Sequence, residues 1–159
     1  MFPAFLRKTE ISKISEGSTV IVEGTVRADR EMALPGEGTK CVYYELLVEV
    51  YKKGARGMGR PLWFPEKLDR KLSGFFVSDG TGEIFVDVPA EQVILQGGFQ
   101  TGGKLDKKGR RRFSARMIRE GDRVRLRGTV ASGVAGVPDG MMMLEPDRKG
   151  RLKITAGPA

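Results

Sequence analysis

Hydrophobic and polar residues alternate most clearly between residues 42 and 51. The even-numbered positions are apolar apart from Tyr44, which we expect to enter the core. The odd-numbered positions include two acids and two tyrosines: Tyr43, Glu45, Glu49 and Tyr51. A period of two is typical of a β-strand that buries one face. The pattern therefore predicts a strand whose polar face carries both Tyr43 and Tyr51.

Two other segments, residues 16–26 and 120–130, share the frame E-G-x-x-V-x-x-x-G-T-V. Alternation in each predicts a strand with one buried face. The residues expected in the core are Val20, Val22, Val26, Val124, Leu126 and Val130. Gly24 and Gly128 stand in mid-strand, which predicts a bulge or a sharp bend of the kind that closes a small barrel. A duplicated unit and two strands that drifted to similar sequences explain the repeat equally well.

Turn and loop signals divide the rest of the chain. Asp79 and Gly80 predict a tight turn within a hairpin over residues 74–88. Residues 89–97 are expected to form one or two helical turns, and residues 98–112 a long basic loop. A basic, glycine-rich connection is expected over residues 52–61.

We expect one domain over residues 1–159, with an N-terminal extension at 1–14 and a C-terminal hairpin and tail at 132–159. Short strands separated by turn signals, without a long helical pattern, indicate an all-β, mostly antiparallel fold. The succession of strands fits an OB-like small β-barrel with at most one short helix and one long basic loop.

The composition excludes several kinds of chemistry. Cys41 is the single cysteine and there is no histidine, so a disulfide within the chain cannot form and a tetrahedral zinc site lacks its usual ligands. Catalytic triads that need an imidazole are excluded as well. Cys41 is expected to be a small, half-buried apolar residue, and Asp79 a turn former. We expect no enzyme activity, no metal, no cofactor and no small-molecule substrate.

The hydropathy pattern shows no candidate membrane span. No segment approaches the ~18 apolar residues that a spanning helix needs. The apolar start, residues 1–6, is too short for a signal peptide. We expect a cytoplasmic location, with a position peripheral to a membrane as the alternative.

The net charge of +8 is concentrated in one segment. Residues 104–127 contain eleven Lys or Arg and three Asp or Glu, which accounts for the whole excess. A local excess of this size predicts an anion-attracting surface. With the basic residues of 52–61 included, the expected anion- or partner-binding residues are Lys52, Lys53, Arg56, Arg60, Lys104, Lys107, Lys108, Arg110, Arg111, Arg112, Arg116, Arg123, Arg125 and Arg127.

Three aromatic residues are candidates for stacking on nucleic acid bases: Tyr51, Trp63 and Phe113. The acids on the strand that holds Tyr51 would repel phosphates, which lowers the case for stacking there. The G-x-x-x-x-G-K match at residues 98–104 is followed by Leu105, where a P-loop needs Ser or Thr, and no helix is expected after it. A phosphate-binding P-loop is therefore not predicted.

Four short motifs occur in the order found in the GIDE, or beside-a-membrane, domain. Residues 35–44 resemble the family's P-x-x-G-x-x-C-V-Y-Y signature, and Trp63 resembles its tryptophan after the variable loop. Residues 76–87 are similar to its F-x-x-D-x-T-G-x-x-x-V-D hairpin, and residues 119–128 to its G-D-x-V-x-x-x-G closing strand. The residues that the resemblance marks as structural are Gly24, Pro35, Cys41, Tyr44, Asp79, Gly82 and Gly128.

The resemblance covers roughly residues 9–157 and implies a function. The GIDE domain accompanies membrane-anchored mitochondrial ubiquitin ligases, whose RING and membrane helices have no counterpart in this sequence, and it occurs in many bacterial and archaeal proteins. What it implies is a non-catalytic interaction module that docks to a protein assembly or an anionic membrane surface, through residues 104–127. The alternative is a single-stranded DNA- or RNA-binding OB-fold protein that uses the same residues.

Overall fold

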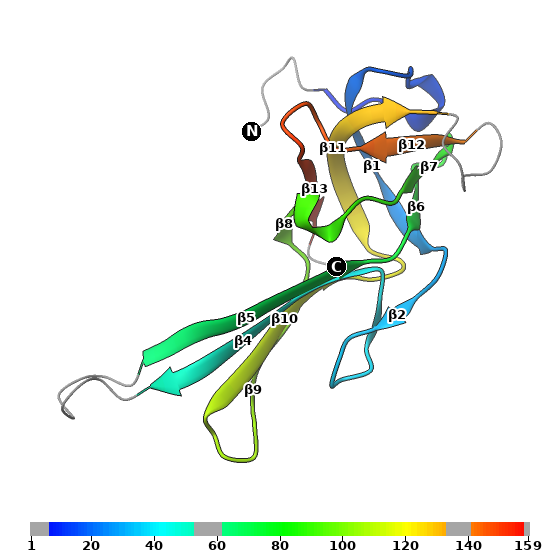
Figure 1. The fold of residues 1–159 in the computed structure, drawn as a ribbon. Coiled ribbons are helices and arrows are strands. Elements are labelled where there is room, and N and C mark those ends of the chain that lie inside the picture. The colour runs from blue at the N-terminus through cyan, green and yellow to red at the C-terminus, as the bar shows by residue number, and fades with distance from the viewer. Residues whose placement is uncertain (1–6, 53–61, 133–140, 158–159) are drawn as a thin grey trace.

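The computed structural model describes residues 7–52, 62–132 and 141–157, which form a β-barrel with a long arm of sheet projecting from it (Figure 1). Five strands close the barrel in the order β1 (Thr19–Ala28), β6 (Phe75–Ser78), β7 (Glu83–Val86), β12 (Met142–Glu145) and β11 (Arg123–Ala131). Pairing of β11 with β1 completes the ring, and β7 with β12 is its one parallel pair. A small closed barrel of this kind is OB-like, so the predicted all-β fold class is confirmed.

Two more strands extend the sheet beyond β11. β13 (Leu152–Ala156) pairs with β11, and β8 (Val93–Gly97) pairs in parallel with β13 and forms an edge. β12 and β13 lie in the segment expected to hold a C-terminal hairpin and tail, and each of them pairs with β11. β12 pairs with residues 129–131 of β11 and β13 pairs with residues 124–127, so the two strands occupy successive parts of β11.

The barrel core is built from inward-facing residues of these strands. Every residue that the repeated frame predicts to be inside is buried: Val20, Val22, Val26, Val124, Leu126 and Val130. Tyr43 also belongs to this core and is 0 % exposed, so its expected place on a polar face is wrong. Tyr43 is at the start of β4, where the strand leaves the barrel. At this end the Tyr43 side of β4 faces the barrel core, and farther along the arm the same side faces solvent.

The two copies of the frame pair with each other as β1 and β11. The Gly17 N–H donates to the Val130 carbonyl at 2.8 Å, and the equivalent Gly121 N–H donates to the Val26 carbonyl at 2.9 Å. The repeat therefore describes two antiparallel strands related by a local two-fold axis. Each copy pairs with the other copy, and the symmetry gives equivalent positions the same surroundings. Equivalent positions therefore favour the same residues.

The arm is a four-stranded antiparallel sheet in the order β5, β4, β10, β9. β4 (Tyr43–Lys52) and β5 (Leu62–Leu72) come from the segment between β1 and β6, together with the short pair β2 (Met32–Ala33) and β3 (Lys40–Cys41). β9 (Phe99–Leu105) and β10 (Arg111–Ile118) come from the segment between β7 and β11. Figure 1 shows the arm reaching well beyond the barrel.

Two local predictions are corrected by the arm and its surroundings, and one strand, β5, is not predicted from the sequence. The long basic loop expected over residues 98–112 is instead β9, a turn and the start of β10. Residues 89–97 form η3 (Ala90–Gln92), a single turn of 3-10 helix, followed by β8. β5 has no alternation in its sequence, but its proline, Pro65, lies on an edge strand beside a register shift, where the missing N–H is tolerated.

Several predictions fall on residues outside the described ranges. They are the basic connection at 53–61 with Lys53, Arg56 and Arg60, the first six residues, and residues 133–140 of the C-terminal segment. η1 (Ile11–Lys13) lies in the part of the N-terminal extension that the structure describes. None of the helices in the described part of the chain has the length or apolar character needed to span a bilayer.

Candidate functional site

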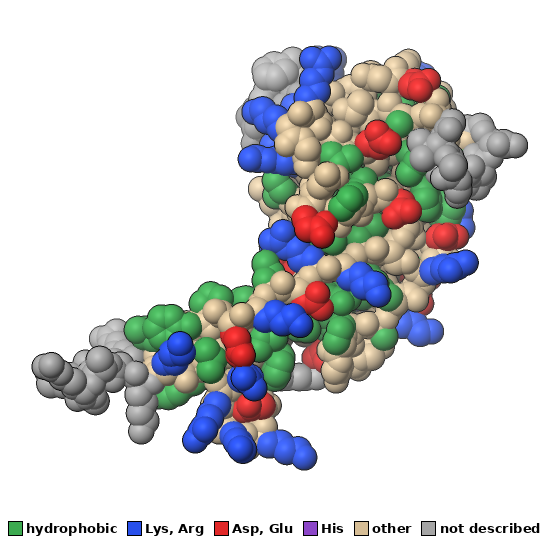
Figure 2. Space-filling model, in the orientation of Figure 1, with side chains coloured by type: hydrophobic (Ala, Val, Ile, Leu, Met, Phe, Trp, Pro, Cys, Tyr) green, Lys and Arg blue, Asp and Glu red, His purple; other side chains and the backbone are tan. Residues whose placement is uncertain are grey.

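Exposed apolar side chains are concentrated on the arm. Seven large hydrophobic residues of the described chain are more than a third exposed, and six of them lie on β5, β9 or β10. Figure 2 shows hydrophobic side chains along the arm with charged ones between them. Strand register places the following on one side of the sheet, which we call the apolar face: Leu46, Val48, Val50, Leu62, Phe64 and Phe113. The same register places four charged residues on this side: Lys52, Lys67, Asp69 and Arg111.

The base of the apolar face is covered by the β2–β3 hairpin. Leu34 from this hairpin packs with Cys41, Tyr44, Ala115 and Met117 in a buried cluster. Cys41 is 0 % exposed rather than half-buried, and burial raises the pKa of its thiol to about 11. The cluster ends at Leu46, and the described residues provide no comparable cover farther along the arm.

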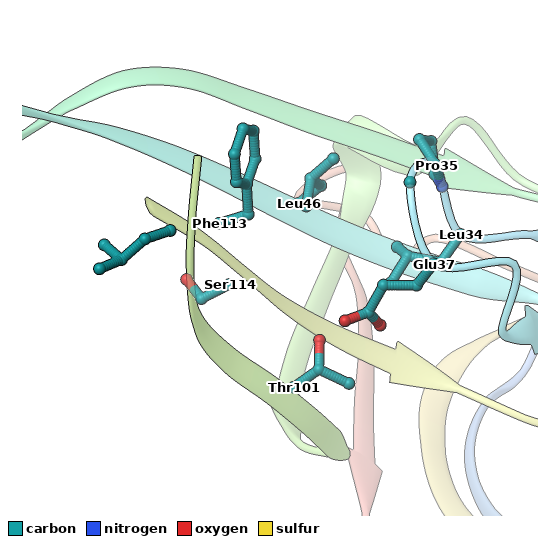
Figure 3. Close-up of a pocket in the computed structure, with 9 residues that line it drawn as sticks. Leu34, Pro35, Glu37, Leu46, Thr101, Phe113 and Ser114 are labelled. Atoms are coloured by element: carbon teal, nitrogen blue, oxygen red, sulfur yellow. The ribbon is translucent and has the colours of Figure 1, made fainter. Parts of the chain in front are cut away.

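A hollow of about 390 Å³ lies where the hairpin cover ends (Figure 3). Leu34, Pro35 and Glu37 form one wall, and Leu46 and Phe113 lie across from them on the arm. Its lining is mostly apolar and it opens to solvent beside the apolar face. The hollow has the size and character to receive a large apolar side chain.

The opposite face of the arm carries pairs of opposite charge. Arg112 Nε lies 2.7 Å from a carboxylate oxygen of Glu49, and Arg116 Nη2 lies 2.8 Å from one of Glu45. Each pair is directly opposite in the β4–β10 register. The hydrogen bond from Arg112 holds the pKa of Glu49 below its usual value. Glu45 also accepts a hydrogen bond from the Tyr43 hydroxyl at 2.7 Å, so its carboxylate is held by both Arg116 and Tyr43.

Two of the three expected stacking residues pack against each other. Tyr51 and Trp63 make an edge-to-face contact with ring centroids 5.4 Å apart. The Arg112 guanidinium lies 4.6 Å from the Trp63 ring centroid. Phe113 is on the other face of the arm, with the apolar residues. The three rings therefore do not form one stacking platform.

The predicted basic set is divided among several places. Arg111 pairs with Glu66 at 2.9 Å, so all three arginines of β10 are neutralised within the arm. The turn between β9 and β10 presents exposed Lys107, Lys108 and Arg110. Lys52 lies 5.7 Å from the Phe64 ring centroid. The side chain of Lys104 is outside the described set.

The rest of the predicted set forms a stripe on the barrel. Arg123, Arg125 and Arg127 face outward from β11, as predicted, between the buried Val124 and Leu126. Arg125 pairs with Glu23 on β1. Lys153 lies directly opposite Arg127 on β13 and belongs to the same surface. Sequence reasoning missed Lys153 because pairing of β13 with β11 is not visible in the sequence.

The outer face of β6 and β7 holds two phenylalanines. Phe76 and Phe85 pack with ring centroids 4.9 Å apart, and each is 7 % exposed. The Arg27 guanidinium lies 4.1 Å from the Phe76 ring centroid and pairs with Glu83. Their ring faces are therefore occupied by the protein itself and are not presented to a ligand.

The remaining residues of the family motif, Gly24, Asp79, Gly82 and Gly128, lie in the barrel and its turns. Asp79 accepts hydrogen bonds from the N–H groups of Thr81, Gly82 and Ile11. A Cβ on Gly24 would lie 2.3 Å from the carbonyl oxygen of Ser78. A Cβ on Gly128 would lie 2.4 Å from that of Glu145. These residues therefore serve the barrel and its turns.

No group of three or more potential metal ligands occurs among the residues that the structure describes. The G-x-x-x-x-G-K match lies mostly on β9 and is followed by β10, so it lacks the helix of a P-loop. Compared with models of protein families, with curated proteins and with solved structures, the chain matches none of them.

Proposed function

We propose that the chain is a non-catalytic interaction module that docks to a partner protein through the apolar face of the arm. The observation that carries this proposal is that the outer part of the arm is a single layer of sheet. A sheet normally buries its hydrophobic face against another element. In the described residues the β2–β3 hairpin covers only the base of the arm. Leu62 and Phe64, farther out, are 53 % and 42 % exposed.

The charges of the arm favour a protein partner over a polyanion. Arg112 and Arg116 are neutralised by glutamates on the neighbouring strand β4, and Arg111 by Glu66 on β5. A phosphate backbone or an anionic membrane would have to compete with these carboxylates. An apolar protein surface would instead remove Phe64 and Phe113 from water, which stabilises a complex by roughly 25 cal/mol per Å² of apolar area before the cost of association is subtracted.

The shape of the arm adds two further means of recognition. The hollow between Pro35 and Phe113 can receive one large apolar side chain of the partner. β5 and β9 are the edges of the arm sheet, and each has unpaired backbone groups on its outer side that a partner strand can use. Side-chain burial and strand addition together describe a partner that presents an extended apolar segment.

The resemblance to the GIDE domain points in the same direction and stays a prediction. It implies an accessory, partner-binding domain, and its signature residue Pro35 lines the hollow. The nucleic acid alternative has weaker support, because Tyr51 and Trp63 pack on each other and lie away from the basic stripe on β11. The docking surface proposed here is thus the arm rather than the whole of residues 104–127.

Site-specific photo-crosslinking tests this proposal. A benzophenone amino acid placed at Phe113 in cells should capture a protein, which is then identified and purified. The complex reconstituted from the two purified proteins should be lost in Phe64→Glu and in Leu62→Glu. Glu91→Lys, an exposed change in η3 on the barrel side, is the matched control and should leave the complex unchanged.

Three outcomes would contradict the proposal. One is a reconstituted complex that survives both arm variants. Another is a chain that self-associates through the arm in analytical ultracentrifugation and so buries the apolar face against a second copy. The third is tight binding of single-stranded DNA or RNA at low salt that weakens steeply at moderate salt. That result would favour a nucleic-acid-binding protein.

A further inference from the structure

The outer face of the extended barrel sheet brings two cations together between two isoleucines. Strand register aligns Ile21 on β1, Arg127 on β11, Lys153 on β13 and Ile94 on β8 in a single row. Arg127 and Lys153 are direct cross-strand neighbours, whose Cβ atoms are about 5 Å apart in such pairs. Their positions are fixed by a continuous sheet rather than by a loop.

A hollow of about 310 Å³ lies over this row. Its walls include Arg127 and Lys153, with Ile21 and Ile94 as the apolar walls and Gln96 as a further polar group. Ile94 is 37 % exposed, although its strand neighbours Val93 and Leu95 are buried. The hollow thus combines a positive floor with apolar sides.

The donors of the row are incompletely used. The Nε atom of Arg127 is buried and has no hydrogen-bond partner in the described structure. A buried, unpaired charged donor costs free energy that a bound acceptor would recover. Glu23, the acid in the adjacent row, is paired with Arg125 and so does not supply the missing acceptor.

Asp147 is an acid that interacts electrostatically with both cations. Burial raises the pKa of Asp147, but hydrogen bonds from the backbone N–H groups of Arg151 and Lys149, with the charges of Arg127 and Lys153, lower it overall. Its Oδ1 atom accepts from Lys149 N–H at 2.9 Å and from Arg151 N–H at 3.1 Å. The carboxylate thus accepts hydrogen bonds within its own turn, and among the described residues no ion pair joins it to Arg127 or Lys153.

We propose that this hollow binds the phosphate group of a phosphate monoester. A phosphate monoester carries close to two negative charges and several acceptor oxygens, which match a guanidinium and an ammonium side by side. A carboxylate carries a single charge and would leave one cation uncompensated. Ile94 would pack against the apolar body of the ligand, whereas Ile21 is only 6 % exposed and offers little surface. The site is on the barrel and does not depend on the docking role of the arm.

Heteronuclear NMR titrations with inorganic phosphate, phenyl phosphate and benzoate test the site. Phenyl phosphate should bind more tightly than inorganic phosphate, and benzoate more weakly than phenyl phosphate. Saturable shifts should be confined to amides of β8, β11 and β13, around residues 94–96, 125–127 and 153–155. Shifts centred elsewhere, or no saturable shifts with phenyl phosphate, would overturn the proposal.

Charge-removal variants sharpen the test. Arg127→Gln and Lys153→Gln should each weaken phenyl phosphate binding by about tenfold or more, as expected for loss of a charge-assisted hydrogen bond. Lys108→Gln removes the same charge from the β9–β10 turn and should change the affinity little. Lys153 is exposed, so its variant keeps the test decisive if Arg127→Gln fails to fold. Equal weakening in all three variants would contradict the site.

Vesicles distinguish the sources of the phosphate group. Phosphatidylcholine vesicles that contain phosphatidic acid carry a phosphate monoester on a lipid, and vesicles of phosphatidylcholine alone lack it. Binding to phosphatidic acid vesicles that Lys153→Gln abolishes assigns the site to a lipid headgroup. Binding to phenyl phosphate without vesicle binding assigns it to a soluble phosphorylated compound. Binding to single-stranded DNA alone would refute a monoester site.

Discussion

Arg112 on β10 and Glu49 on β4 lie directly opposite each other, with Nε and a carboxylate oxygen 2.7 Å apart. They are 63 residues apart in the chain. The same guanidinium lies 4.6 Å from the Trp63 ring centroid on β5. One side chain thereby joins three strands of the arm, and its charge is used inside the protein.

Reversing one partner of this pair should weaken the arm, whereas exchanging the two should restore it. Glu49→Arg places two cations opposite each other, and like charges directly across a strand pair are destabilising. The double variant Glu49→Arg with Arg112→Glu should regain most of the loss. Thermal unfolding of the two single variants and the double variant measures the coupling. Strictly additive effects would mean that the pair contributes nothing.

The same pair predicts that the stability of the protein depends on pH in the acid range. The hydrogen bond from Arg112 lowers the pKa of Glu49 below its ordinary value of 4.5. The stabilisation is therefore present above pH 4.5 and is lost as the pH falls through the lower pKa of the folded state. Glu49→Gln should remove this part of the acid dependence in urea unfolding measured from pH 6 downward.

Replacing Asp79 with alanine should destabilise the barrel by about 1–3 kcal/mol, because several N–H groups lose their acceptor. The carboxylate accepts from Ile11 N–H at 2.8 Å and from Thr81 N–H at 2.8 Å, so it ties η1 to the β6–β7 turn. Urea unfolding measures the loss. Asp87→Ala removes an exposed acid at the end of β7 and should have little effect.

The difference in the free energy of unfolding between wild type and Asp79→Ala should become smaller in acid. Burial raises the pKa of Asp79, but hydrogen bonds from Thr81, Ile11 and Gly82 outweigh burial and lower it below the ordinary value of 3.8. The ionic part of the stabilisation is present above pH 3.8 and disappears as the pH falls through the folded-state pKa. A difference that grows as the pH falls would contradict the role of the carboxylate.

Adding a methyl group at Gly24 should be poorly tolerated. The new Cβ would lie 2.3 Å from the Ser78 carbonyl oxygen, which is backbone and cannot move aside without opening the barrel. Gly24→Ala should cost at least about 2 kcal/mol, as overpacking against fixed atoms does. Gly157→Ala is the control, because its Cβ would meet no atom within 4 Å. Equal unfolding midpoints for the two variants would show that β1 and β6 can separate there.

Cys41 should be inert in the folded protein. The side chain is 0 % exposed and burial raises the pKa of its thiol to about 11, so little thiolate forms near neutral pH. Labelling with an aromatic disulfide reagent should be slow in buffer and complete in guanidinium chloride. Rapid labelling of the native chain would mean that the cluster beneath the arm opens readily.

The barrel could be predicted because its signals are local. Alternation in the frames at 16–26 and 120–130 identifies buried Val22 and Leu126. The β1–β11 register runs past Gly24 and Gly128 without a shift, so neither glycine marks a bulge in this pair. Asp79 and Gly80 locate a turn from two adjacent residues. The alternation and the turn each depend on neighbours in sequence, and the structure confirms both.

The arm could not be predicted because its stability comes from pairing between distant segments. β9 is rich in glycine and β5 contains Pro65 and many charges, so neither has a strand pattern of its own. Arg116 and Glu45 are 71 residues apart, so counting charge within residues 104–127 could not reveal their pairing. Lys153 joins the basic stripe only because β13 pairs with β11.

The origin of the arm has a consequence for engineering. β4 and β5 leave the barrel between β1 and β6, whereas β9 and β10 leave it between β7 and β11, and the two hairpins meet along β4 and β10. Neither hairpin can be transplanted alone, since each would lose the partner along its inner edge. A split version of the chain, cut between β7 and β8, would therefore carry half of the arm on each fragment. Reassembly of the arm would then report that the two fragments had found each other.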